Sequence, residues 1–167
     1  MCGIIGFVGN EPAAPILLDG LERMEYRGYD SAGVAVRSET AGLQVRKTKG
    51  RLQVLSDLIH GGADLEGNLG IGHTRWATHG EPNDINAHPH VSENGRIALV
   101  HNGIIENYLE IKEHLMRQGV HFPSDTDTEV VAQLLEFHYN ECHNMLEAVG
   151  RCLRRIEGSY AFGIICA

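Results

Sequence analysis

The chain has 167 residues, of which 43% are hydrophobic and 22% are charged, and its formal net charge is −8 at pH 7. This composition is typical of a single globular domain that is long enough to bury a core. The negative balance argues against a surface that binds nucleic acid or an anionic membrane, because both partners are polyanions.

Hydrophobic spacing and glycine-rich breaks predict the elements of the first half. In chain order these are a strand over 3–9, a helix over 12–25, a hairpin with strands 32–36 and 43–47 around Gly42, a short helix over 50–59 and a strand over 69–73.

The second half begins with a predicted strand over 97–101 and is then mainly helical. One helix is predicted from an apolar face that Gly119 ends, formed by Ile104, Tyr108, Ile111 and Leu115. Thr126 and Glu129 form a capping-box pattern before a second helix, and an apolar stripe over 145–156 predicts a third. With a final strand over 160–166, the pattern favours a layered α+β domain. Because the chain stops directly after that strand, we expect residues 1–167 to be an incomplete domain.

The four cysteines have neither metal-binding nor disulfide spacing, which favours reduced thiols and a cytoplasmic protein. The first residues lack the features of a secretory signal, and no apolar run approaches the length of a membrane span.

Cys2 follows the initiator methionine, which is normally removed before a small residue. The mature chain would then begin with a residue that carries both a thiol and an α-amino group. The thiolate is the attacking species, and a free cysteine has a pKa of about 8.5. An α-amino group with a pKa of about 7.7 to 8.0 can take the thiol proton. Alternatively, Cys2 is simply a small apolar residue at the start of a strand.

Six motifs that cover nearly the whole chain resemble the signature of the class II glutamine amidotransferases. They are MCGIIG at 1–6, EYRGYDSAG at 25–33, HTRWATHG at 73–80, NAHPH at 86–90, HNGIIEN at 101–107 and SDTDTE at 124–129. The second and third motifs are similar to those of the glucosamine-6-phosphate synthases within that family.

The resemblance implies an N-terminal-nucleophile hydrolase fold, a four-layer α/β/β/α sandwich of antiparallel sheets. It also implies that Cys2 hydrolyses L-glutamine through a thioester, with no cofactor. Fructose 6-phosphate would receive the ammonia in an isomerase half that this chain does not contain, and the full enzyme would be a homo-oligomer.

The resemblance assigns the two charged groups of glutamine to two residues. Arg75 would hold the α-carboxylate, since a guanidinium can bind two oxygens at once. Asp127 would hold the α-ammonium, although it also lies where it could cap a helix.

The oxyanion that forms in this reaction is stabilised by hydrogen-bond donors that are already in position. By resemblance these are the Asn102 side chain and the Gly103 backbone N–H. The alternative for an Asn-Gly pair is a tight hairpin turn.

Four further residues are implied near the site. Trp76, Thr78 and His79 would line the site from the loop that carries Arg75 and closes over glutamine, and Arg27 would brace the N-terminal residue. A core-packing tryptophan is the alternative for Trp76.

Five histidines lie between positions 73 and 101, which raises the question of a zinc site. No HExxH helix is present, so we expect no metal and instead a hydrogen-bonded framework. Two other functions stay open at this point: an amidotransferase with another acceptor, such as an amidophosphoribosyltransferase, and a silent domain that only binds glutamine.

Overall fold

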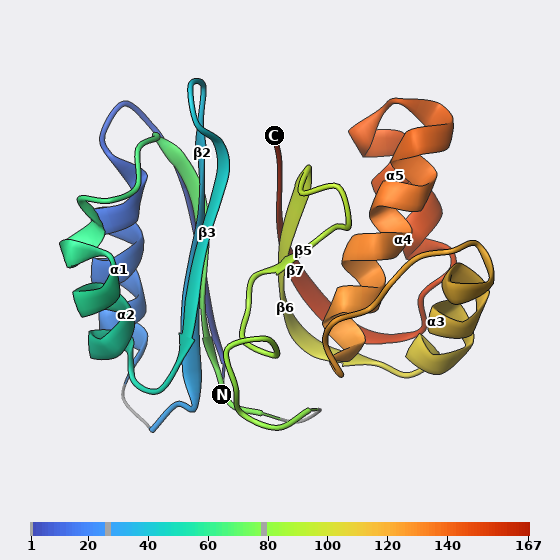
Figure 1. The fold of residues 1–167 in the computed structure, drawn as a ribbon, viewed down its shortest axis with the longest axis horizontal. Coiled ribbons are helices and arrows are strands. Elements are labelled where there is room, and N and C mark those ends of the chain that lie inside the picture. Colours follow the sequence, from blue (N-terminus) through green and yellow to red (C-terminus); the bar gives the residue numbers. More distant parts are fainter. Residues whose placement is uncertain (1, 26–27, 78–79) are drawn as a thin grey trace.

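The computed structural model describes residues 2–25, 28–77 and 80–167, and these residues form four layers (Figure 1). A four-stranded antiparallel sheet has the order β1-β4-β2-β3. Its strands are β1 (Gly3–Val8), β2 (Ser31–Ser38), β3 (Gly42–Lys49) and β4 (Leu69–Arg75). The helices α1 (Ala13–Met24) and α2 (Leu52–Leu58) cover its outer face, and a short 3₁₀ turn follows at His60–Gly62.

The second half of the chain forms the other two layers. Its antiparallel sheet has the order β5-β6-β7, with β5 (His90–Val91), β6 (Ile97–Ile105) and β7 (Gly158–Cys166). The helices α3 (Tyr108–Arg117), α4 (Asp127–Cys142) and α5 (Met145–Leu153) lie on the outer side of this sheet.

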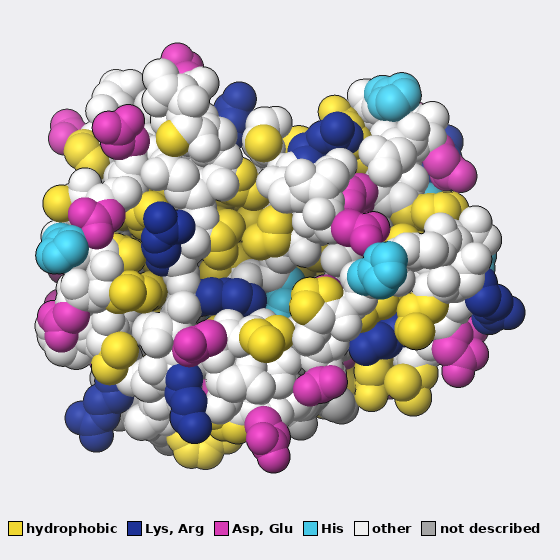
Figure 2. Space-filling view, in the orientation of Figure 1, with side chains coloured by type: hydrophobic (Ala, Val, Ile, Leu, Met, Phe, Trp, Pro, Cys, Tyr) yellow, Lys and Arg dark blue, Asp and Glu magenta, His cyan; other side chains and the backbone are white. Residues whose placement is uncertain are grey.

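Alternation of side chains along the strands separates the apolar core into three clusters. On β2, Val34 and Val36 pack toward α1 and α2, whereas Ala35 between them belongs to the cluster that joins the two sheets. A third cluster joins β6 and β7 to the C-terminal helices. Figure 2 shows hydrophobic side chains in a hollow between the two halves of the molecule, while acidic and basic side chains are interspersed around it.

The structure confirms most of the predicted elements and corrects the region after His101. The predicted strand over 97–101 extends to Ile105, so Ile104 belongs to β6 and is not part of a helix. The helix that follows begins at Tyr108. The sequence also did not predict β5, because a strand of two residues carries too short a pattern.

The predicted capping box at the start of α4 is confirmed in one half only, because the Glu129 side chain does not reach back to the backbone N–H of Thr126, which donates instead to the Ser124 hydroxyl. The Thr126 side chain accepts the backbone N–H of Glu129 and is the N-cap. The Glu129 carboxylate in turn accepts the backbone N–H of Ser124 at 2.8 Å. Within the described ranges, no helix combines the length and the hydrophobicity that a membrane span requires.

Candidate active site

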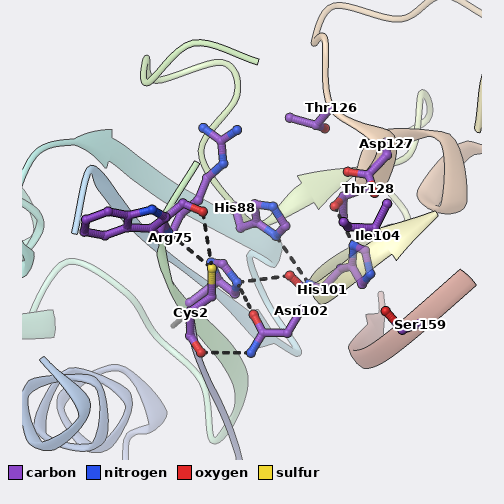
Figure 3. Close-up of a pocket in the computed structure, with 13 residues that line it drawn as sticks. Cys2, Arg75, His88, His101, Asn102, Ile104, Thr126, Asp127, Thr128 and Ser159 are labelled. Carbon is purple, nitrogen blue, oxygen red and sulfur yellow. Dashed lines mark hydrogen bonds between the residues drawn. The ribbon is translucent and has the colours of Figure 1, made fainter. Parts of the chain in front are cut away.

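A cavity of about 420 Å³ lies where the ends of both sheets meet the start of α4 (Figure 3). It is lined by Cys2, His73, Arg75, Trp76, His88, His101, Asn102, Gly103, Ile104, Thr126, Asp127, Thr128 and Ser159. Residues that are far apart in the sequence therefore share one cavity.

Strand alternation explains why these side chains face one another. Ile4, Ile71 and Val100 all pack in the cluster between the two sheets. Cys2 lies two residues before Ile4, and Asn102 lies two residues after Val100. Side chains two residues apart on a strand point to the same face, so Cys2 and Asn102 both face the space between the sheets. On β4, Ile71 is followed on that same face by His73 and then by Arg75.

Cys2 is held beside the end of β4 by antiparallel pairing. Gly3 lies opposite Thr74 and donates its N–H to the Thr74 Oγ1 atom at 3.3 Å. The Trp76 backbone N–H donates to the Cys2 Sγ atom at 3.2 Å, and the Trp76 carbonyl oxygen lies 3.6 Å from the same sulfur. A Cβ atom on Gly3 would lie 2.8 Å from Thr74 Oγ1, so glycine permits this close pairing.

Asn102 and Gly103 do not form the hairpin turn that was one interpretation of this pair. They lie within β6, opposite Ala161 and Tyr160 of β7. Gly103 has a φ of 133°, and a Cβ atom there would lie 1.9 Å from the Ser159 carbonyl oxygen. Only glycine fits this position, because other residues would need both a strained backbone and space that is already occupied.

The Asn102 side chain connects the two sheets. Its Nδ2 atom donates to the Cys2 carbonyl oxygen at 3.0 Å, and its Oδ1 atom lies 2.9 Å from Nε2 of His73. The amide of Asn102 therefore contacts the backbone of the candidate nucleophile directly.

Arg75 and Asp127 bring opposite charges to the cavity wall. Arg75 is 4% exposed, and its side chain donates to the Gly80 carbonyl oxygen at 3.1 Å and lies 3.8 Å from the Asp30 carboxylate. Asp127 is 5% exposed and accepts the Ile105 backbone N–H at 2.8 Å. Since Thr126 is the N-cap, Asp127 is not the helix cap that its position in the motif also suggested.

Trp76 is 53% exposed and lines the cavity, so the core-packing interpretation of this residue is wrong. The predicted site residues Arg27, Thr78 and His79 lie outside the described residues.

Four buried histidines form a polar framework at the cavity, as predicted, and three of them line its wall. Besides its contact with Asn102, His73 stacks on His88 with ring centroids 4.1 Å apart. His88 accepts the backbone N–H of His101 through its Nδ1 atom at 3.3 Å. His101 and His90 contact the hydroxyl groups of Thr128 and Thr126, at 2.9 and 3.0 Å.

Burial keeps these imidazoles uncharged near neutral pH. It lowers the pKa of His73 to about 4, and it lowers the pKa values of His88 and His90 well below the ordinary value. Burial also lowers the pKa of His101, although the nearby Asp127 carboxylate opposes that shift. The framework therefore supplies neutral hydrogen-bonding groups to the site.

The segment that carries His88 is anchored on the first sheet. Lys47 donates to the carbonyl oxygens of Ile85 and Ala87 at 2.9 and 2.7 Å, and burial lowers its pKa to about 8. A Cβ atom on Gly33, which lies opposite Lys47, would be 2.0 Å from the His88 carbonyl oxygen. Glycine at 33 thus admits the backbone of His88 against the sheet.

The sequence-based site omitted His73, His88, His101 and Thr128, which the structure places on the cavity wall. The close spacing of the histidines indicated that these rings could belong to the site, but spacing alone did not show which ring faces the cavity. In the described part of the chain, no group of three or more His, Cys, Asp or Glu side chains is arranged to hold a metal ion.

Comparisons with known proteins agree with this geometry. A family profile described as a glutamine amidotransferase domain matches residues 40–166. The glutamine–fructose-6-phosphate aminotransferase (isomerizing) of Caldanaerobacter subterraneus subsp. tengcongensis is 57% identical over 99% of this chain. The enzyme of that name from Thermus thermophilus is 58% identical over 96% of it. The chain covers only 27% and 26% of these two relatives, about a quarter of their length.

A solved structure supports the fold. The glutamine phosphoribosylpyrophosphate amidotransferase from B. subtilis, in complex with ADP and GMP, superposes with a TM-score of 0.82 at 29% identity. The match covers 99% of this chain and 35% of that one. Together with the two antiparallel sheets between helical layers, it confirms the predicted four-layer fold of the N-terminal-nucleophile hydrolases.

Proposed function

This chain belongs to the glutamine amidotransferase domain family, and we propose that it hydrolyses L-glutamine to glutamate and ammonia with Cys2 as the nucleophile. The observation that carries the proposal is the convergence of Cys2, Arg75, Asn102, Gly103 and Asp127 on one cavity. A thiol, an anion-binding group, a cation-binding group and oxyanion donors are the parts that this reaction needs.

Glutamine is a zwitterion, and two buried side chains of opposite charge can orient it. Arg75 binds the α-carboxylate through its guanidinium, and Asp127 binds the α-ammonium. Because both side chains are at least 95% buried, each ionic hydrogen bond forms in a poorly solvated environment and is stronger than on the surface. The side-chain amide of the substrate then extends toward Cys2.

The chemistry proceeds by two acyl transfers. With Met1 removed, the α-amino group of Cys2 takes the thiol proton, and Sγ attacks the amide carbon of glutamine. The Asn102 Nδ2–H and Gly103 N–H groups donate to the oxyanion. The C–N bond breaks as the ammonium group returns the proton to the departing nitrogen, which leaves as ammonia. Water attacks the thioester, the C–S bond breaks, and glutamate and the free thiol are formed.

We propose further that fructose 6-phosphate receives the ammonia in a longer protein that contains this chain. The support is the name and the 57% identity of the relative from C. subterraneus, whose remaining length would hold the acceptor site.

A cytoplasmic location is supported by the four cysteines, all of which are free thiols. A homo-oligomeric state stays a prediction.

Ammonia release from glutamine by the full-length protein tests the hydrolysis. The Cys2→Ala variant should release no ammonia and still bind glutamine in a calorimetric titration. Cys142→Ala is the matched control, because Cys142 lies at the end of α4 outside the cavity and should leave the rate unchanged. Full activity in Cys2→Ala would refute the assignment of Cys2 as the nucleophile.

Assays of the same full-length protein distinguish this function from two alternatives. An amidophosphoribosyltransferase, favoured only by the structural match at 29% identity, would pass ammonia to phosphoribosyl pyrophosphate and not to fructose 6-phosphate. A silent sensor would bind glutamine and release no ammonia even with Cys2 intact.

A further inference from the structure

His73 contacts the candidate oxyanion donor and is not part of the reaction described above. It lies on β4 with 1% of its surface exposed. Its Nε2 atom is 2.9 Å from the Oδ1 atom of Asn102 and 3.1 Å from the carbonyl oxygen of His101. Figure 3 shows the hydrogen bonds that converge on Asn102 between the two sheets.

The orientation of the Asn102 amide follows from the partner on its other side. The Cys2 carbonyl oxygen, 3.0 Å away, can only accept a hydrogen bond, so the NH₂ group of Asn102 must face it. The Oδ1 atom of Asn102 must then face His73. A rotated amide would place two oxygens against each other at Cys2.

The same reasoning determines the tautomer of His73. Both neighbours of its Nε2 atom, Asn102 Oδ1 and the His101 carbonyl oxygen, are acceptors, so Nε2 carries the proton. The Nδ1 atom is buried with no hydrogen-bond partner among the described residues, which agrees with an unprotonated nitrogen. Burial also lowers the pKa of this ring to about 4, so the neutral form prevails at neutral pH.

We propose that His73, as the Nε2–H tautomer, is a positioning residue that keeps the Asn102 amide turned with its N–H groups toward Cys2 and the oxyanion. The proposal rests on the proposed function, because it assigns His73 to the orientation of a donor in that reaction. An oxyanion donor works best when it is oriented before charge develops, and without the His73 donor only the Cys2 carbonyl oxygen would hold the Asn102 amide in this orientation.

Two substitutions of His73 separate orientation from packing. His73→Gln retains an N–H donor near the position of Nε2, whereas the shorter amide of His73→Asn does not reach it. For the full-length protein we expect kcat for glutamine hydrolysis to fall at least about tenfold in His73→Asn, with KM within about twofold. His73→Gln should recover most of the lost kcat. His121→Asn, at an exposed histidine outside the cavity, is the matched control.

The kinetic results have distinct meanings. Equal losses in both His73 variants, an unchanged kcat in His73→Asn, or a rise in KM alone would overturn the proposal. Cys2→Ala in the same assay tests the proposed function separately: if it stays active, the hydrolytic mechanism fails, whereas an inactive Cys2→Ala with a fully active His73→Asn refutes only the role of His73.

A measurement on the unsubstituted protein applies even if the variants do not fold. The ¹⁵N resonances of the His73 ring distinguish a protonated from an unprotonated nitrogen. We expect the protonated signal at Nε2 and the unprotonated signal at Nδ1 at pH 7. A proton on Nδ1 alone would overturn the proposal, because Nε2 could not then donate to Asn102.

Discussion

The Asp127 Oδ2 atom accepts the backbone N–H of Ile105 at 2.8 Å, which joins the first residue of α4 to the last residue of β6. This bond holds the carboxylate at the cavity wall through Ile105, which lies two residues after Gly103, where β6 has a positive φ. The candidate ammonium-binding group and the candidate oxyanion donors are therefore held in one arrangement by the backbone.

Replacement of Asp127 by asparagine should weaken substrate binding without unfolding the site. The asparagine oxygen can still accept the Ile105 N–H, but the negative charge is lost. Because a hydrogen bond to a charged group contributes about 1.5 to 3 kcal/mol, KM for glutamine should rise about tenfold or more. Steady-state kinetics measures this, with Asp125→Asn, an exposed neighbour outside the cavity, as the control. An unchanged KM would remove Asp127 from the binding site.

Arg75→Lys keeps the charge and loses the planar fork. One arm of the guanidinium donates to the Gly80 carbonyl oxygen, and a lysine ammonium lacks the planar fork that binds two substrate oxygens side by side at the same time. We expect kcat/KM for glutamine to fall at least about tenfold, or about 1.4 kcal/mol. Arg23→Lys at an exposed surface ion pair should have no effect. Equal activity in the two variants would contradict the role of Arg75.

Asn102→Asp tests the oxyanion assignment. A carboxylate cannot donate to the Cys2 carbonyl oxygen or to the oxyanion, so turnover should fall about a hundredfold or more. The lost hydrogen bond should also lower the free energy of unfolding by about 1 to 3 kcal/mol, so turnover is measured well below the melting temperature.

Asn107→Asp is the matched control for that substitution. Asn107 also uses both ends of its amide, donating to the Arg155 carbonyl oxygen and accepting the Glu157 N–H, but it lies outside the cavity. It should lose stability and keep its turnover. If Asn102→Asp lost no more activity than this control, other groups would have to stabilise the oxyanion.

Because the His73 ring is buried, we expect the free energy of unfolding to fall in acid. Its pKa is about 4 in the folded chain and about 6.5 when unfolded, so between these values only the unfolded chain binds the proton. The free energy of unfolding should therefore fall by about 2 kcal/mol between pH 7 and pH 5 from His73 alone, and His88 and His90 act in the same direction.

Urea unfolding at both pH values checks this contribution. The His73→Gln variant should show a smaller decrease between pH 7 and pH 5 than the unsubstituted chain, by about 2 kcal/mol. The same decrease in both proteins would mean that burial does not lower the pKa of His73.

The mature, active protein should begin at Cys2. Intact mass spectrometry should show the loss of one methionine, because the proposed base is the α-amino group of Cys2. Chemical acetylation of that amine should abolish ammonia release. An active protein that retains Met1 or has an acetylated N-terminus would contradict the role of the Cys2 α-amino group as the base.

Local patterns predicted the elements whose causes are local. The N-cap at Thr126 and the hairpin around Gly42 depend on residues a few positions apart, and the structure has both. The strand predicted over 69–73 is also present, but the structure extends it to Arg75, which brings Ile71, His73 and Arg75 to one face because the side-chain period of a strand is two.

The path of the chain through Asn102 and Gly103 could not be read from local pattern. An Asn-Gly pair fits a tight turn as well as a distorted strand. The strand forms because β7, much later in the chain, pairs with β6 as far as Ile105 and leaves no room for a side chain at 103.

The motifs in the sequence identified the chemical groups: a thiol at position 2, a guanidinium at 75, an amide at 102 and a carboxylate at 127. Their mutual positions, and the choice of His73 among several histidines as the partner of Asn102, arise only when the two sheets stack. The reason is physical: each of these hydrogen bonds joins segments that no local interaction brings together, so its geometry depends on the packing of the whole domain.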